Sequence, residues 1–288
     1  MGDAVRIVEV GPRDGLQNEP VAVPTAVKVA FIDALSQSGL KEIEASAFVS
    51  PAAIPQLHDA EEVFAAIARA PGVAYSALVP NERGLERALR SKVDKVAVFT
   101  AASETFNRHN IHASIAESIE RFRPVVAGAR AAGLPVRGYV STAFWCPYEG
   151  KVEPDKTVEV TRMLVDLGVD EVSIGDTIGK AVPAEVDILL DRLFPVVPAT
   201  RLAMHFHDTY HHALDNVLAS LRRGITIFDA STGGIGGCPY APGASGNVSM
   251  EGVIGVLTAA GEATGVDLLA LGRARGVIEA SLGRAIGS

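Results

Sequence analysis

Val136-Arg-Gly-Tyr-Val140, Pro154–Leu167 and Glu171-Val-Ser-Ile174 follow one another along the chain. The first and third segments are short and apolar, as in buried strands, whereas the middle segment has the length of a helix. Pro154 suits the first turn of that helix, and Gly168 follows its last turn, where a left-handed cap is common. These residues therefore predict a strand–helix–strand unit of a parallel sheet.

The same alternation runs through the whole chain. The candidate strands are Arg6–Val10, Glu42–Ala45, Ala74–Val79, Lys95–Phe99, Val136–Val140, Glu171–Ile174, Leu202–Phe206 and Ile227–Ala230. The candidate helices between them include Pro24–Ser38, Glu82–Arg90, Ser114–Ala132, Pro154–Leu167, Ala184–Leu193 and Tyr210–Leu221. Eight such units predict a closed (β/α)8 barrel, formed by residues 1–288 as one domain, with helices after Val248 packed on it. A doubly wound open sheet is the other candidate, but its Gly-x-Gly-x-x-Gly fingerprint is absent after the first strand.

Composition narrows the classes of partner. The 288 residues are 48% hydrophobic and carry a net charge of -8, from 26 basic and 34 acidic side chains. Because no long basic run is present, we expect neither nucleic acid nor a membrane surface as a partner. No apolar run is long enough to span a bilayer.

Cysteine usage and the first residues bear on the compartment. Cys146 and Cys238 are far apart and lack metal-type spacing, which favours a reducing environment. Residues 1–10 enter a strand pattern at once and lack the features of a signal or transit peptide. We therefore expect a cytoplasmic protein, and the expected assembly is a homodimer.

Two histidines after a late strand suggest a metal site. His205 and His207 point to the same face of an extended strand, roughly 6.6 Å apart along it. Together they could hold one divalent ion, with Asp14 and a carboxamide from elsewhere completing the ligand set. Such mixed nitrogen and oxygen ligands favour Lewis-acid chemistry on an oxygen-rich substrate. A purely structural histidine pair is the alternative.

Further polar residues follow other strands, at the end of the barrel where catalysis occurs in this fold. Arg13 could stabilise an enolate oxygen or act as a structural ion-pair partner. Glu44 and Asp176 could orient a ligand or transfer protons, and an ion pair inside the barrel is an equal alternative for each. Cys238 lies in the glycine-rich segment Thr232–Asn247, which we expect to form a mobile loop over the rim. It could be a nucleophile, a proton carrier or a small buried residue.

Several of these stretches resemble the 3-hydroxy-3-methylglutaryl-CoA lyase family. The matching motifs are Val10–Glu19, Phe48–Pro51, Leu78–Asn81, Arg137–Ser141, Cys146–Lys151, Ser173–Gly179, His205–Tyr210 and Gly233–Asn247. The cysteine loop is specific to the lyase. The Arg-Asp and His-x-His motifs are shared with a wider superfamily of metal-dependent aldolases and Claisen-type synthases.

The resemblance implies a (β/α)8 barrel that splits an acyl-CoA substrate into acetyl-CoA and acetoacetate with a divalent ion, Mg²⁺ or Mn²⁺. The implied metal ligands are Asp14, His205, His207 and Asn247. The implied catalytic residues are Arg13 for the enolate, Cys238 for proton transfer, Glu44 and Asp176 for proton traffic at the C3 hydroxyl, and His205.

Two positions depart from the family pattern. Trp145 and His211 are bulkier than expected there, which leaves open a lyase for a longer 3-hydroxy-3-alkylglutaryl-CoA. A catalytically silent barrel and a condensing synthase are further alternatives. The retained ligands argue against the first, and the cysteine loop argues against the second.

Overall fold

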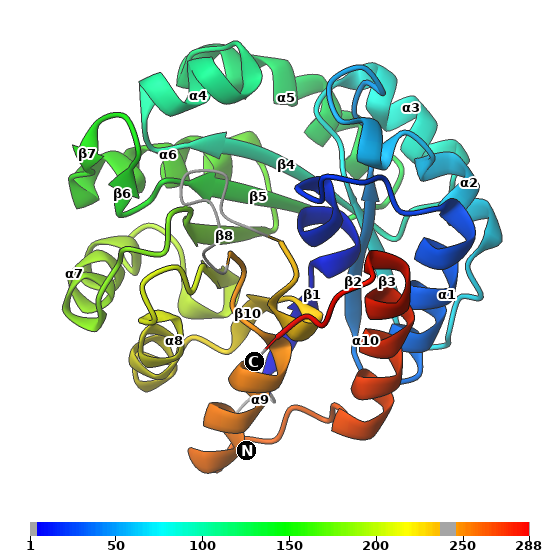
Figure 1. The fold of residues 1–288 in the computed structure, drawn as a ribbon. Helices are drawn as coiled ribbons and strands as arrows, with labels where there is room; N and C mark the ends of the chain where they lie inside the picture. Colours follow the sequence, from blue (N-terminus) through cyan, green and yellow to red (C-terminus); the bar gives the residue numbers. More distant parts are fainter. Residues whose placement is uncertain (1–4, 237–245, 288) are drawn as a thin grey trace.

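Eight parallel strands close into a barrel in the computed structural model, which describes residues 5–236 and 246–287. The strands are β1 (Arg6–Glu9), β2 (Glu42–Ala47), β3 (Ala74–Leu78), β4 (Lys95–Ala101), β5 (Val136–Ser141), β8 (Glu171–Asp176), β9 (Leu202–Phe206) and β10 (Ile227–Ala230). Their order around the ring is β1-β10-β9-β8-β5-β4-β3-β2 (Figure 1). The predicted (β/α)8 barrel is therefore confirmed.

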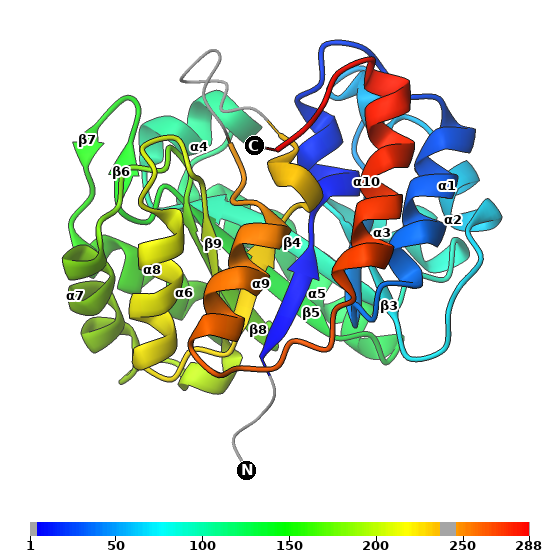
Figure 2. The same cartoon turned by 60° about the horizontal axis from the view of Figure 1, so that its bottom comes forward.

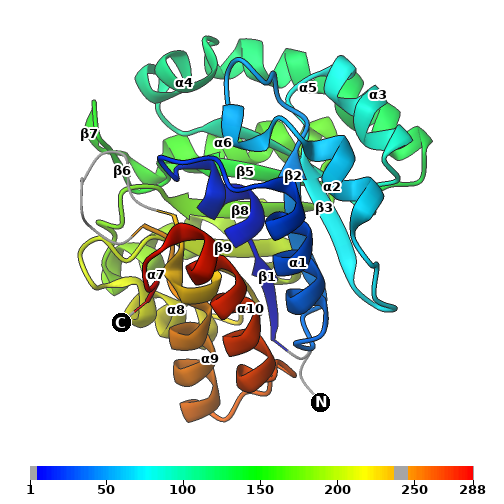
Figure 3. The ribbon, with the colours of Figure 1, turned by 45° about the vertical axis from the view of Figure 1, so that its right-hand side comes forward.

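Helices surround the ring of strands. They are α1 (Thr25–Ser36), α2 (Ala60–Ala66), α3 (Glu82–Arg90), α4 (Glu104–Ile111), α5 (Ile115–Ala131), α6 (Pro154–Leu167), α7 (Pro183–Leu193), α8 (Ala213–Arg222), α9 (Met250–Ala259) and α10 (Leu268–Leu282). As predicted, the last helices pack on the barrel, and α10 runs beside α1 (Figure 3). In the described part of the chain, we find no helix with the length and apolarity needed to cross a membrane.

Helix ends follow local chemistry. Helices α3 and α6 have the predicted bounds, and Gly168 ends α6 in the left-handed conformation, at φ 100°. The helix predicted from Tyr210 instead begins at Ala213. The reason is that His211 has φ 61° and the Asp208 carboxylate accepts a hydrogen bond from the Ala213 backbone N–H at 3.1 Å. Helices α2 and α4 and the short hairpin of β6 (Trp145–Cys146) and β7 (Gly150–Lys151) were not predicted.

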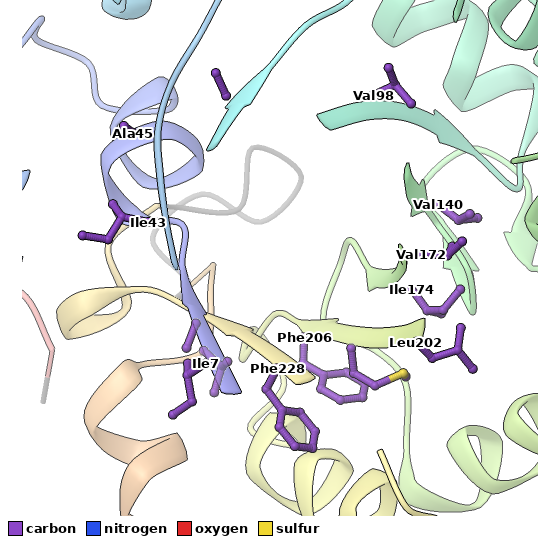
Figure 4. Packing of buried hydrophobic residues seen from close by; sticks show 14 of the residues in the cluster. Ile7, Ile43, Ala45, Val98, Val140, Val172, Ile174, Leu202, Phe206 and Phe228 are labelled. Atoms are coloured by element: carbon purple, nitrogen blue, oxygen red, sulfur yellow. The ribbon is translucent and has the colours of Figure 1, made fainter. Parts of the chain in front are cut away.

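The main apolar core lies between the strands and the helices. Alternate strand residues, such as Ile7, Ile43, Val98 and Val140, are fully or almost fully buried there (Figure 4). The other strand residues point into the barrel. This arrangement follows from the two-residue period of a strand, and it leaves the barrel axis to a different set of side chains.

Charged side chains fill much of the barrel interior, where branched apolar residues are usual in this fold. Lys95 lies between Glu42 and Glu171, with ion pairs of 3.0 and 3.1 Å, and Arg6 pairs with the same two carboxylates. Arg137 continues the network: its Nε lies 3.3 Å from Glu171. The Arg137 Nη2 lies 2.5 Å from Asp229, which adds the sixth charge. Three cations thus face three anions.

Lys95→Met should destabilise the barrel strongly, because it leaves the buried Glu42 and Glu171 carboxylates with one cation fewer. We expect a loss of about 3 kcal/mol in the free energy of unfolding, measured by urea denaturation. Arg123→Met is the control. It removes the exposed Arg123–Glu120 pair and should cost less than about 1 kcal/mol. Equal losses in the two variants would contradict a structural role for the interior network.

Candidate metal and catalytic site

The carboxyl end of the barrel carries the predicted site. Strand β1 points toward this end, where the β6–β7 hairpin also lies (Figure 2). Beyond β1, the chain turns tightly through Gly11–Gly15, which carries Arg13 and Asp14. Glycine is required at both ends of this turn. An added Cβ would lie 2.6 Å from a Glu9 oxygen at Gly11 and 2.6 Å from the Ile235 side chain at Gly15.

Three predicted ligands come together at this end. Asp14, His205 and His207 each offer a ligand atom, and these atoms lie within 4.8 Å of one another. The His205 Nε2 faces the Asp14 Oδ2 at 3.9 Å, and the two imidazole centroids are 5.3 Å apart. His205 in β9, His207 just after it and Asp14 in the turn after β1 can therefore hold one ion between them.

The fourth predicted ligand lies beside these three. Asn247 pairs with His207 through a backbone bridge, and its Nδ2 donates a 2.9 Å hydrogen bond to the Asp14 Oδ2. The Asn247 Oδ1 and the His207 Nδ1 are buried and have no hydrogen-bond partner among the described residues. Two imidazoles, a carboxylate and a carboxamide oxygen are a donor set that fits a divalent ion.

Charge states in this cluster suit a cation. Burial would raise the pKa of Asp14, but Arg13 and the two histidines lower it below its usual value, so Asp14 is anionic. Burial and the neighbouring His205 lower the pKa of His207 to about 4, so its imidazole is neutral and keeps a lone pair. Burial also opposes the charged form of His205, but the hydrogen bond with Asp229 and the negative charges of Asp229 and Asp14 together outweigh it and raise the pKa of His205.

Arg13 is fixed between two carboxylates. Its Nε and Nη2 lie 2.7 and 2.6 Å from the Glu44 Oε2, and its Nη1 lies 2.6 Å from the Asp14 Oδ1. The Tyr139 ring lies under the guanidinium, with its centroid at 5.6 Å. Burial raises the pKa of Glu44 against the opposing effect of Arg13. The interior ion pair considered for Glu44 is therefore present, and it orients Arg13.

Asp176 is also buried, but it is engaged elsewhere. Its two carboxylate oxygens accept hydrogen bonds from the backbone N–H groups of Lys180 and Ala181, at 3.1 and 3.0 Å. Burial raises the pKa of Asp176 to about 7. These contacts hold the loop between β8 and α7, so the described role of Asp176 is to shape that loop, and its catalytic role stays a prediction.

Cys238 lies outside the described residues, but both ends of its segment lie at the site. The Asn247 backbone N–H donates to the Gly236 oxygen at 3.2 Å, next to the metal-ligand cluster. Gly236 has φ 114°, and an added Cβ would lie 2.8 Å from the Asn247 Nδ2. Gly236 and Asn247 thus both lie beside the cluster.

Sequence reasoning missed two buried acids. Glu9 accepts hydrogen bonds from the Gly11 backbone and from the Thr232 backbone and hydroxyl, and burial raises its pKa to about 7. Asp229 accepts from His205 and Arg137. Each is an acidic residue within a short, mostly apolar strand. That position in the sequence is the one feature that could have identified both as groups inside the barrel.

The fold and this site define the class: a (β/α)8-barrel enzyme with a candidate metal site at the carboxyl ends of its strands. The HMGL-like family model matches residues 4–278. The chain belongs to this family, that of the hydroxymethylglutaryl-CoA lyases.

Named relatives cover most of the chain. A cytoplasmic 3-hydroxy-3-methylglutaryl-CoA lyase of Rattus norvegicus is 50% identical, over 92% of this chain and 77% of the relative. A 3-hydroxy-3-isohexenylglutaryl-CoA/hydroxy-methylglutaryl-CoA lyase of Pseudomonas aeruginosa is 51% identical, over 93% and 89%. The crystal structure of a hydroxymethylglutaryl-CoA lyase from Pseudomonas aeruginosa has a TM-score of 0.97 at 50% identity, covering 100% and 96% of the two chains.

His207→Ala should abolish tight metal binding while the barrel stays folded, because rim residues of this fold contribute mainly to function. We expect the Kd for Mn²⁺ to rise by more than about 100-fold, measured by calorimetric titration of the chelator-treated protein. His211→Ala is the matched control, since the His211 side chain is 85% exposed. Unchanged Mn²⁺ binding in His207→Ala would show that the ligand set is wrong.

Proposed function

We propose that this protein is a metal-dependent carbon–carbon lyase that cleaves 3-hydroxy-3-methylglutaryl-CoA to acetyl-CoA and acetoacetate. One observation supports this most directly: the Asp14, His205 and His207 cluster lies beside a buried arginine, in a chain about 50% identical to lyases of that name. The proposal includes a single domain, a cytoplasmic location and a homodimer. The relatives themselves are named from both cytoplasm and mitochondria.

Asp14, His205, His207 and Asn247 would hold the ion, which we propose to be Mg²⁺ or Mn²⁺. A bound ion would supply Lewis acidity toward the hydroxyl and carboxylate oxygens of the substrate. Two observations support this assignment: the His207 imidazole is neutral, and the His207 Nδ1 and the Asn247 Oδ1 have no hydrogen-bond partner among the described residues. Neither atom therefore has to break a described hydrogen bond to bind an ion.

Arg13 would stabilise the enolate of the departing acetyl-CoA. Three of its five N–H groups face Glu44 and Asp14, which leaves two for a substrate oxygen. Because the guanidinium is already fixed, little reorganisation is needed when negative charge develops on the thioester oxygen.

The proton steps are assigned by resemblance. Cleavage removes the proton of the C3 hydroxyl and places a proton on the new carbon of acetyl-CoA. We propose Cys238 as the donor to carbon, because a thiol near pKa 8.5 can exchange protons near neutrality. Glu44, His205 and Asp176 would assist at the hydroxyl. Of these three residues, Glu44 contacts Arg13 and His205 faces Asp14, so both lie next to the groups proposed to bind the enolate and the metal ion.

A longer 3-alkyl group is the second candidate specificity. It is favoured by the relative whose name includes the isohexenyl substrate. Trp145 and His211 do not decide it. The Trp145 ring packs against Lys180, with the Nζ 4.1 Å from the ring centroid, and its Nε1 donates to Glu185 at 3.1 Å, while His211 is exposed.

An acyl-CoA partner is further supported by a related HMG-CoA lyase of Acinetobacter baumannii. It is 38% identical, has a TM-score of 0.94, covers 99% of this chain and 93% of its own, and was solved with coenzyme A and 3-methylmalate.

The purified protein should release acetyl-CoA and acetoacetate from 3-hydroxy-3-methylglutaryl-CoA when Mg²⁺ or Mn²⁺ is present, measured by coupled assay and mass spectrometry. The chelator-treated protein should be inactive until metal is restored. Comparing kcat/KM for the methyl and isohexenyl thioesters separates the two specificities. Cleavage of neither thioester by Mn²⁺-loaded protein would reject the proposed function.

Arg13→Gln should lower kcat by about 10²- to 10³-fold with little change in KM, because enolate charge develops only along the reaction path. Mn²⁺ affinity and thermal unfolding serve as controls, since the change leaves Glu44 without its cation. An increase in KM at normal kcat would instead assign Arg13 to substrate anchoring.

A further inference from the structure

The side of His205 that faces away from the metal-ligand cluster contacts a buried acid. The His205 Nδ1 lies 3.2 Å from the Oδ2 of Asp229, whereas its Nε2 faces Asp14. Asp229 is on β10, in register with His205 on the neighbouring β9, and is 2% exposed. The two ring nitrogens of His205 therefore have different neighbours: Nδ1 contacts Asp229, and Nε2 faces the metal-ligand cluster.

Two further side chains, Arg137 and Ser173, hold the Asp229 carboxylate in place. Its Oδ1 accepts a 2.5 Å hydrogen bond from the Arg137 Nη2, and its Oδ2 accepts a 2.8 Å hydrogen bond from the Ser173 hydroxyl. Arg137 is 1% exposed, and the Tyr139 ring lies 4.9 Å from its Cζ. Neither rotation of the carboxylate nor entry of a competing donor is favoured in such packing.

A carboxylate only accepts hydrogen bonds, so a neutral His205 must place its proton on Nδ1 to satisfy Asp229. The Nε2 lone pair then points toward Asp14. We propose that Asp229 is a positioning residue that fixes His205 in this tautomer and thereby sets the affinity of the metal site. This inference rests on the proposed metal site, but it concerns a residue outside the proposed ligand set.

Asp229→Asn is a sharp test, because the amide would reverse the proton arrangement. Arg137 only donates, so it retains the amide oxygen at the Oδ1 position. The amide NH₂ then replaces Oδ2 and donates to the His205 Nδ1. The proton of His205 moves to Nε2, where it blocks the lone pair. In a Ser-His-Asp triad, the same substitution keeps the geometry and produces the wrong tautomer.

Glu171→Gln is the matched control. It removes one negative charge from the same interior network and weakens a contact to the same Arg137, but Asp229 separates it from His205. Both variants should lose thermal stability. Only Asp229→Asn should raise the Kd for Mn²⁺, by about 10- to 100-fold, in calorimetric titrations of the chelator-treated full chain. Ser173→Ala keeps the carboxylate and should raise the Kd by about fivefold, through loss of one hydrogen bond to Asp229.

The tautomer itself supplies a readout that a general loss of stability would not change. We expect ¹⁵N NMR of the metal-free protein, recorded at a pH high enough for His205 to be neutral, to show its proton at Nδ1 in the wild type and in Glu171→Gln, and at Nε2 in Asp229→Asn. Nδ1 protonation in Asp229→Asn, or equal losses of Mn²⁺ affinity in Asp229→Asn and Glu171→Gln, would overturn the proposal. If Asp229→Asn fails to fold, wild-type Mn²⁺ affinity in Ser173→Ala has the same meaning. Failure of the wild type to bind Mn²⁺ would instead reject the metal site.

Discussion

Pairing of buried charges inside the barrel is the constraint on which the site depends. Removing a carboxylate or a guanidinium from water costs several kcal/mol, so each charge in the interior must lie beside an opposite charge. Arg6, Lys95 and Arg137 meet Glu42, Glu171 and Asp229 in this way. The pairing ends at Asp229, which contacts the candidate metal ligand His205. Interior stability and site geometry are therefore set by the same contacts.

The charge at the rim explains how an acidic protein can bind an anionic substrate. The net charge is -8, so the field of the whole molecule repels carboxylates and phosphates. At the site, Asp14 shares the Arg13 guanidinium with Glu44 and has a lowered pKa, so this candidate ligand is negatively charged. A divalent ion would reverse that sign locally.

Sequence patterns predicted the barrel, and the meeting of the candidate ligands at its end, for physical reasons. Strand and helix periods are local, so the alternation that begins with residues 136–174 revealed the fold. His205 and His207 were found because a strand places both on one face. Other features depend on contacts between distant residues. Asp229 meets Arg137, which is 92 positions away, and no local pattern links the two residues. Glu44 could be assigned to an ion pair only once β2 lay next to the turn after β1.

Strand β10 shows why such contacts matter more than motifs. It lies between β1 and β9, the two strands whose ends carry Asp14 and the histidines. On one side, Asp229 orients His205; on the other, Thr232 just beyond the strand donates to Glu9 at the end of β1. Glu9 in turn accepts the Gly11 N–H at the start of the turn that carries Asp14. The strand between the two groups of candidate ligands thus contacts both groups and supplies no candidate ligand itself, because barrel closure places it there.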